Sequence, residues 1–110
     1  MGGIMPWILL FLAGLTEVIW SYLMKQSLGF TRFWPTVGTV TFMLGSFALL
    51  SVSMKTLPLG TAYTIWTGIG ALGAFVVGVA VLGEHLSAGR VIAALLILGG
   101  IILMKLSSTS

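Results

Sequence analysis

The sequence predicts an all-α integral membrane protein with four transmembrane helices, and two observations support this. Of the 110 residues, 58% are hydrophobic and only 6% are charged, whereas a soluble domain of this size needs far more polar surface. The few charges also divide the chain into four apolar blocks. A spanning helix needs about 20 apolar residues to cross a hydrocarbon core of roughly 30 Å. We therefore expect residues 1–110 to form one four-helix transmembrane domain in the lipid bilayer.

The helices are expected at approximately residues 4–25, 33–54, 58–83 and 87–106. The first block has no basic segment before it and exceeds signal-peptide length, so we expect it to be retained. The second and third blocks contain no charge. The fourth lies between Arg90 and Lys105, whose long side chains must extend to the membrane surface if it is to span. Short connectors containing Pro58 and several glycines suit breaks between helices and predict an up-down-up-down arrangement.

The basic residues are nearly balanced between the two sides of this arrangement. Three of them (Lys25, Arg32 and Arg90) lie on the side of the first and third connectors, and two (Lys55 and Lys105) lie on the other side. A difference of three to two is too small to fix the orientation by the positive-inside rule. We therefore expect insertion in both orientations. Two oppositely oriented copies could then pair as an antiparallel homodimer, which would supply the inverted repeat of many transporters.

The remaining ionisable residues are too few for most enzyme chemistry. The chain has no cysteine and no aspartate, its acids are Glu17 and Glu84, and its one histidine is His85. No nucleophile–base pair can be built from these groups, and no metal-ligand spacing is present. We expect no enzyme activity, no metal and no cofactor, and we assign Glu84 and His85 no role. The scattered basic residues form no patch for nucleic acid.

Glu17 is the principal functional candidate because it interrupts the first apolar block. It follows Trp7 by ten residues, or about 15 Å of helix, which predicts a position near the midplane. A carboxylate there is costly and usually serves binding or transport. Such a group can hold a proton or a cation but hardly remains bare. We interpret Glu17 as a substrate- and proton-binding residue. The alternative is a protonated acid that only bonds a neighbouring helix.

Polar and aromatic side chains in other blocks suit the walls of a cation site. Tyr63 and Trp66 share one helix face in "GTAYTIWTG", and aromatic faces bind organic cations. Ser46 lies midway along the second block. Taken alone, the aromatic residues could belong to an interfacial belt, and the serine could bond its own helix. Their combination with Glu17 favours a binding site.

Small residues in the last two helices indicate close helix approach. Gly68, Gly70 and Gly73 lie in the third helix, where glycine permits either a bend or close packing. Ala93 and Gly100 are seven residues apart in the fourth helix. That spacing is one heptad of a seam suited to a helix–helix dimer contact. Packing within one chain is the alternative for this pair.

Three segments together resemble the small multidrug resistance family of bacterial proton-coupled exporters: "EVIWSYLMKQSLGFTRFWPTVGT", "LPLGTAYTIWTGIGALGA" and "GGIILMKLSS". The resemblance covers nearly the whole chain. It implies four helices per chain, an antiparallel dual-topology homodimer in the bacterial inner membrane, and exchange of a cation for protons at a shared pair of glutamates. It also implies residue roles. Glu17 matches the substrate- and proton-binding acid, Trp20 and Ser46 its hydrogen-bond partners, and Tyr63 and Trp66 the site walls.

Within that family the chain looks like the guanidinium-exporter subtype. The features that carry this resemblance are Trp20 three residues after Glu17, "TGIGALGA" in the third helix and Lys105 in the fourth. Relatives that export quaternary-ammonium drugs usually have glycine where Trp20 stands. The implied substrates are guanidinium and small guanidinyl cations, moved by alternating access. The alternatives are a broader quaternary-ammonium or multidrug cation–proton antiporter, a lipid-carrier flippase subunit, and an accessory membrane protein in which Glu17 directs assembly.

Overall fold

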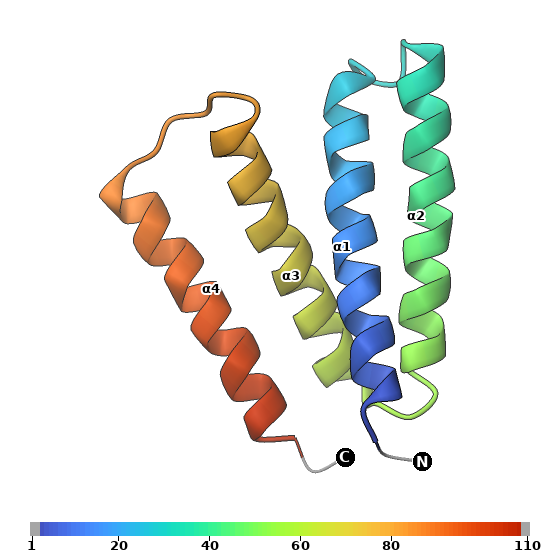
Figure 1. Ribbon diagram of the computed structural model, residues 1–110, viewed down its shortest axis with the longest axis vertical. Coiled ribbons are helices and arrows are strands. Elements are labelled where there is room, and N and C mark those ends of the chain that lie inside the picture. Colours follow the sequence, from blue (N-terminus) through green and yellow to red (C-terminus); the bar gives the residue numbers. More distant parts are fainter. Residues whose placement is uncertain (1–2, 109–110) are drawn as a thin grey trace.

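The computed structural model describes residues 3–108, which form four α-helices (Figure 1): α1 Met5–Gln26, α2 Phe33–Ser53, α3 Leu59–Ala80 and α4 Ala88–Leu106. By length and composition, each of the four can cross a membrane. The prediction of an all-α chain with four apolar spanning helices is therefore confirmed.

Local sequence accounts for where the helices begin. Pro6 lies in the first turn of α1, where the missing N–H removes no intrahelical bond. Pro58 directly precedes α3 and fixes the entry of the chain into that helix. The Ser87 hydroxyl accepts a hydrogen bond from the backbone N–H of Arg90 at 3.2 Å and caps α4.

The third helix ends at Ala80, three residues before the boundary expected from its apolar block. Gly83 has a φ of 70°, a left-handed conformation that suits glycine and turns the chain away from the helix axis. The backbone N–H of Glu84 then donates to the carbonyl of Gly78 at 2.9 Å. Apolar composition alone extended the predicted helix into this turn.

The four helices form a thin layer, and this layer is not a closed bundle. Its extents are 42 × 35 × 17 Å, and the smallest is not much larger than the ~10–12 Å diameter of a helix with its side chains. The order across the layer is α2, α1, α3, α4 (Figure 1), with α1 packed along both α2 and α3 and with α4 packed on α3. Consecutive helices run in opposite directions, so both termini and the α2–α3 connector lie at one end (Figure 1).

The hydrophobic core lies between α1, α2 and α3, mostly toward the end with the termini. Its buried apolar side chains are Leu10, Ala13, Leu50, Leu57, Ala62, Ile65 and Trp66. Within the described part of the chain, α4 contributes no buried residue. The apolar face of α4 is therefore available to lipid or to another protein surface.

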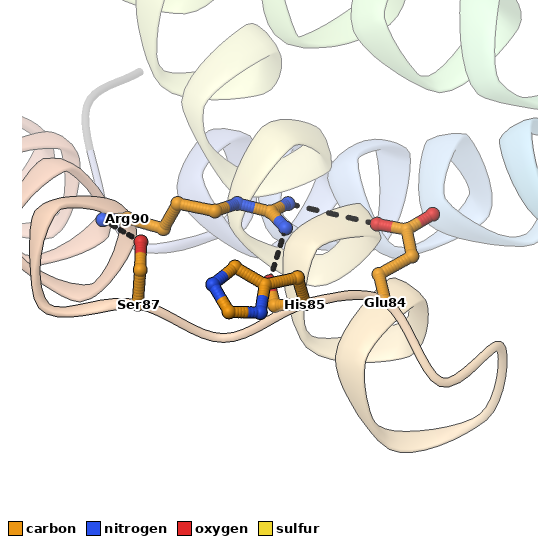
Figure 2. A network of polar contacts seen from close by, with 4 residues as sticks. All are labelled: Glu84, His85, Ser87 and Arg90. Atoms are coloured by element: carbon orange, nitrogen blue, oxygen red, sulfur yellow. Dashed lines mark hydrogen bonds and ion pairs between the residues drawn. The ribbon is translucent and has the colours of Figure 1, made fainter.

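Arg90 organises the α3–α4 connector at the opposite end (Figure 2). Its guanidinium lies 3.6 Å from the carboxylate of Glu84 and donates to the backbone carbonyl of His85. The same group lies 5.2 Å from the centre of the Phe75 ring on α3. The ion pair is 41% and 43% exposed, so water weakens it and it contributes little stability.

Candidate functional site

Glu17 lies midway along α1, where α1 crosses α3. It is twelve residues from the start of the helix, or about 18 Å along its axis. Its carboxyl packs directly on Gly70 of α3, where an added Cβ would lie 2.1 Å from Oε1. Only a residue without a side chain leaves room for the carboxyl in this position.

Two more glycines bring α1 and α3 close on either side of this contact. A Cβ on Gly14 would lie 2.4 Å from the side chain of Ile69, and one on Gly73 would lie 2.1 Å from the side chain of Val18. Gly14 belongs to α1 and Gly73 to α3, so each helix receives a branched side chain from the other. This reciprocal packing fixes the position along α3 that Glu17 contacts.

Of the three glycines expected to bend or pack α3, Gly68 contacts α4 and the other two contact α1. A Cβ on Gly68 would lie 2.7 Å from the side chain of Ile101. The helix is continuous from Leu59 to Ala80 across all three. Close packing accounts for these glycines in this structure without any interruption of the helix.

Ser46 joins α1, α2 and α3 through two buried hydrogen bonds. Its hydroxyl donates to the carbonyl of Ala13 at 2.7 Å and accepts from the indole N–H of Trp66 at 3.0 Å. The resemblance implied instead that Ser46 bonds the carboxyl of Glu17. A hydroxyl has a single O–H donor, and here Ala13 uses it, so the expected bond is not made. Ser46 instead lies beside the helical turn that precedes Glu17.

The position of the Trp20 side chain also differs from the one that the resemblance implied, in which Trp20 bonds Glu17. Its ring packs edge-on against Phe47 of α2 with centroids 6.4 Å apart, while the carboxyl of Glu17 faces Gly70 on α3. Within residues 3–108, neither the indole N–H of Trp20 nor Oε1 of Glu17 has a hydrogen-bond partner, although both atoms are buried. The two side chains leave α1 toward different neighbours, so the structure does not join them.

An aromatic row connects α1, α2 and α3, and its first ring belongs to Trp20, three residues after Glu17. It runs from Trp20 through Phe47 and Trp66 to Tyr63, with successive ring centroids 6.4, 5.9 and 5.5 Å apart. Trp66 is buried, whereas Tyr63 is 52% exposed at the end of the row. Phe47 was not among the residues predicted from the sequence. One phenylalanine in an uncharged apolar block carries no distinguishing pattern, and its only signal was its position next to Ser46.

The residues expected at a dimer contact, Ala93 and Gly100, are both exposed on α4. An added Cβ on Gly100 would meet nothing within 4 Å. Packing within the described chain therefore gives no reason for a glycine at this position, and the dimer contact stays a prediction.

Comparison with known proteins places the chain in a family. The family model described as Small Multidrug Resistance protein matches residues 5–97. A guanidinium exporter of Salmonella typhimurium is 53% identical over 104 residues, covering 94% of this chain and 99% of that protein. Guanidinium exporters of Citrobacter freundii and Yersinia pseudotuberculosis are each 50% identical over 104 residues, covering 94% of this chain and 99% and 100% of those proteins. With its four apolar helices, the chain is a multi-pass membrane protein that belongs to the small multidrug resistance family.

Proposed function

We propose that this chain is an antiporter of the bacterial inner membrane that exports guanidinium and small guanidinyl cations in exchange for protons. One observation carries the proposal. Glu17 is the acidic residue within the four helices, and its buried Oε1 has no hydrogen-bond partner within residues 3–108. An unmatched carboxyl oxygen in a membrane needs a proton or a cation. The guanidinium exporters of similar sequence support guanidinium as that cation.

The chemistry around Glu17 suits guanidinium. A planar guanidinium presents pairs of N–H donors that match the two oxygens of a carboxylate. The aromatic row of Trp20, Phe47, Trp66 and Tyr63 offers ring faces, on which delocalised cations stack favourably. A carboxyl resting on the backbone of Gly70 has fewer positions available than one on an open surface, so its lone pairs point in restricted directions.

Competition for Glu17 would couple the two fluxes. A proton and a guanidinium ion bind the same carboxyl oxygens, so one leaves before the other is held. Since the bare carboxylate is costly in the membrane, the site changes its access from one side to the other with either ligand bound. Alternating access with mutually exclusive ligands produces exchange.

The proposed assembly is an antiparallel homodimer with two Glu17 side chains in one site. The thin layer supports this because Glu17, which packs on α3, is only partly buried in one chain. An inverted second copy would close the open face and add the second acid. The exposed small residues Ala93 and Gly100 of α4 would form part of the contact. The near balance of basic residues on the two sides favours insertion of both orientations.

Proton-coupled uptake in proteoliposomes tests the proposal, with guanidinium and tetrapropylammonium as parallel substrates. The wild type is expected to move protons when guanidinium is supplied. Glu17→Gln should lose this flux because glutamine keeps the shape but cannot cycle a proton, while Glu84→Gln, at the exposed α3–α4 connector, should keep it. Guanidinium-driven proton flux that persists in Glu17→Gln would remove Glu17 from the site. A wild type that prefers tetrapropylammonium would favour the broader multidrug cation antiporter.

A further inference from the structure

An apolar groove opens between α1, α3 and α4, and neither Glu17 nor Gly70 is among the residues that line it. Its volume is about 280 Å³, and each helix contributes aliphatic or aromatic side chains to its wall: Leu10 and Phe11, Ile65 and Ile69, and Ile101 and Ile102. Because these three helices are apolar enough to span a membrane, such a groove lies within reach of lipid acyl chains.

A lysine stands at the rim of this groove. Lys105 in the last turn of α4 is one of its lining residues, together with Trp7 in the first turn of α1. The ammonium nitrogen of Lys105 lies 4.6 Å from the centre of the Trp7 ring. The first turn of α1 and the last turn of α4, which hold these two residues, lie at the end of the layer that carries the termini (Figure 1). Tryptophan and lysine at helix ends are typical of the membrane–water interface.

No acidic side chain is placed to neutralise Lys105. The chain has two acids. The carboxyl of Glu17 packs on Gly70 midway along the helices, and Glu84 is paired with Arg90 in the connector at the other end. A positive charge at the interface with an aromatic neighbour and no acidic side chain as its partner within residues 3–108 is complementary to an anionic headgroup.

Comparison with a second groove shows why the charge of Lys105 indicates which lipid the first groove binds. It lies between α1 and α3, has a volume of about 290 Å³, and is lined by Val18, Ile19, Tyr22, Leu23, Val77 and Val81. None of these six residues is a lysine, arginine, histidine, aspartate or glutamate. A groove of this kind can accept an acyl chain from any lipid. The groove between α1, α3 and α4 has similar space and adds a cation at its rim.

We propose that the groove between α1, α3 and α4 binds one acyl chain of an anionic phospholipid, whose phosphate pairs with Lys105. An ammonium group has three N–H donors, so it can donate to a phosphate oxygen while it stays over the face of Trp7. The acyl chain then covers apolar side chains of three helices, and the lipid links the C-terminal end of α4 to α1. The site does not involve Glu17 and is independent of the transported cation.

Quenching of Trp7 fluorescence by brominated lipid tests this proposal. The full chain is placed in vesicles of equal amounts of phosphatidylglycerol and phosphatidylcholine, with bromine on the acyl chains of one lipid or the other. The contribution of Trp7 is the difference between the wild type and Trp7→Phe, which keeps an aromatic face for Lys105. We expect brominated phosphatidylglycerol to occupy the groove with a preference of about fivefold, the size of effect expected for one lysine near an anionic lipid.

Matched lysine variants distinguish lipid binding in this groove from a general attraction of anionic lipid to the positive charge of the protein. Lys105→Gln should abolish the preference and Lys105→Arg should keep it. Lys55→Gln should also keep it, because it removes the same charge from the α2–α3 connector at the same end of the layer (Figure 1). Equal quenching by the two lipids in the wild type would overturn the proposal, as would a preference that survives Lys105→Gln. Protection of Trp7 from both lipids would also overturn it and would indicate that protein, such as a second copy, covers the groove.

Discussion

Gly70 of α3 forms the surface on which the carboxyl of Glu17 rests, and an added Cβ would lie 2.1 Å from Oε1 and 2.3 Å from the carboxyl carbon. The atoms in the way belong to the free end of a flexible side chain, while the backbones of α1 and α3 are not in conflict there. A larger residue at this position would therefore move the carboxyl before it separated the helices. Position 70 controls where the acid points.

Gly70→Ala is expected to impair exchange while the chain still folds. The added methyl group displaces the carboxyl, so guanidinium should lose one of its two charge-assisted hydrogen bonds. Such a loss, at ~1.5 kcal/mol, corresponds to about a tenfold weaker apparent affinity. The measurement is guanidinium-driven proton flux against guanidinium concentration in proteoliposomes.

Gly45→Ala in α2 is the matched control for this change. A Cβ on Gly45 meets nothing within 4 Å, so this variant should keep the wild-type affinity. If Gly70→Ala also kept it, the contact with α3 would not be what positions Glu17.

Ser46→Ala is expected to lower the free energy of unfolding by about 1 kcal/mol, within the range measured for hydrogen bonds between membrane helices. The change leaves the buried indole N–H of Trp66 and the carbonyl of Ala13 without their partner. Reversible unfolding in mixed detergent micelles measures the difference. Ser51→Ala, at an exposed position of the same helix, should change the free energy by much less. Equal losses in the two variants would show that the hydrogen bonds of Ser46 contribute nothing.

Trp20→Gly is expected to shift selectivity from guanidinium toward bulky quaternary cations. The change removes a buried indole N–H that has no hydrogen-bond partner within residues 3–108 and opens space between α1 and Phe47. Tetrapropylammonium has no N–H donor and depends on space and aromatic contact, so it should gain from this change, whereas guanidinium should not.

A paired transport assay with the two cations checks this selectivity prediction. Trp34→Gly is its control, because Trp34 is 77% exposed near the start of α2 and is not part of the aromatic row. This variant should keep the wild-type preference. An unchanged ratio of the two transport rates in Trp20→Gly would mean that Trp20 does not limit the size of the substrate.

The helices were predictable from the sequence because charge interrupts the apolar blocks where the membrane ends. The end of α3 was not, since an uncharged stretch continues past Ala80 to Gly83. There the backbone bond from Glu84 to Gly78 turns the chain. Apolar composition indicates that a stretch can lie in the membrane, but it does not indicate which residues of that stretch are helical.

The site was predictable as a set of residue types, but its pairings were not. Intramembrane Glu17 indicated a site because its burial is costly without a function. Its contact with Gly70 depends on the register of α1 against α3, which a single sequence does not contain. The resemblance assigned Ser46 and Trp20 to Glu17, whereas in this chain Ser46 bonds Ala13 and Trp66.

The count of basic residues bears on the proposed dual orientation. Three basic residues lie on the side of the α1–α2 and α3–α4 connectors and two on the other side, and an acidic residue such as Glu84 has little influence on orientation. The two sides thus differ by a single basic residue. A chain so balanced should respond to the loss of one charge.

Arg32→Ala is expected to increase the fraction of chains whose α1–α2 connector faces outward, because each side then carries two basic residues and the excess that holds this connector inside is lost. The chain has no cysteine, so single introduced cysteines report orientation through an impermeant maleimide. Labelling from outside should increase at Thr31→Cys and decrease at Thr56→Cys when Arg32 is replaced. Lys55→Ala should produce the opposite shift, since it removes a charge from the other side. If the otherwise wild-type chain were labelled at only one of these two positions, it would insert in one orientation, and the antiparallel homodimer would have to be abandoned.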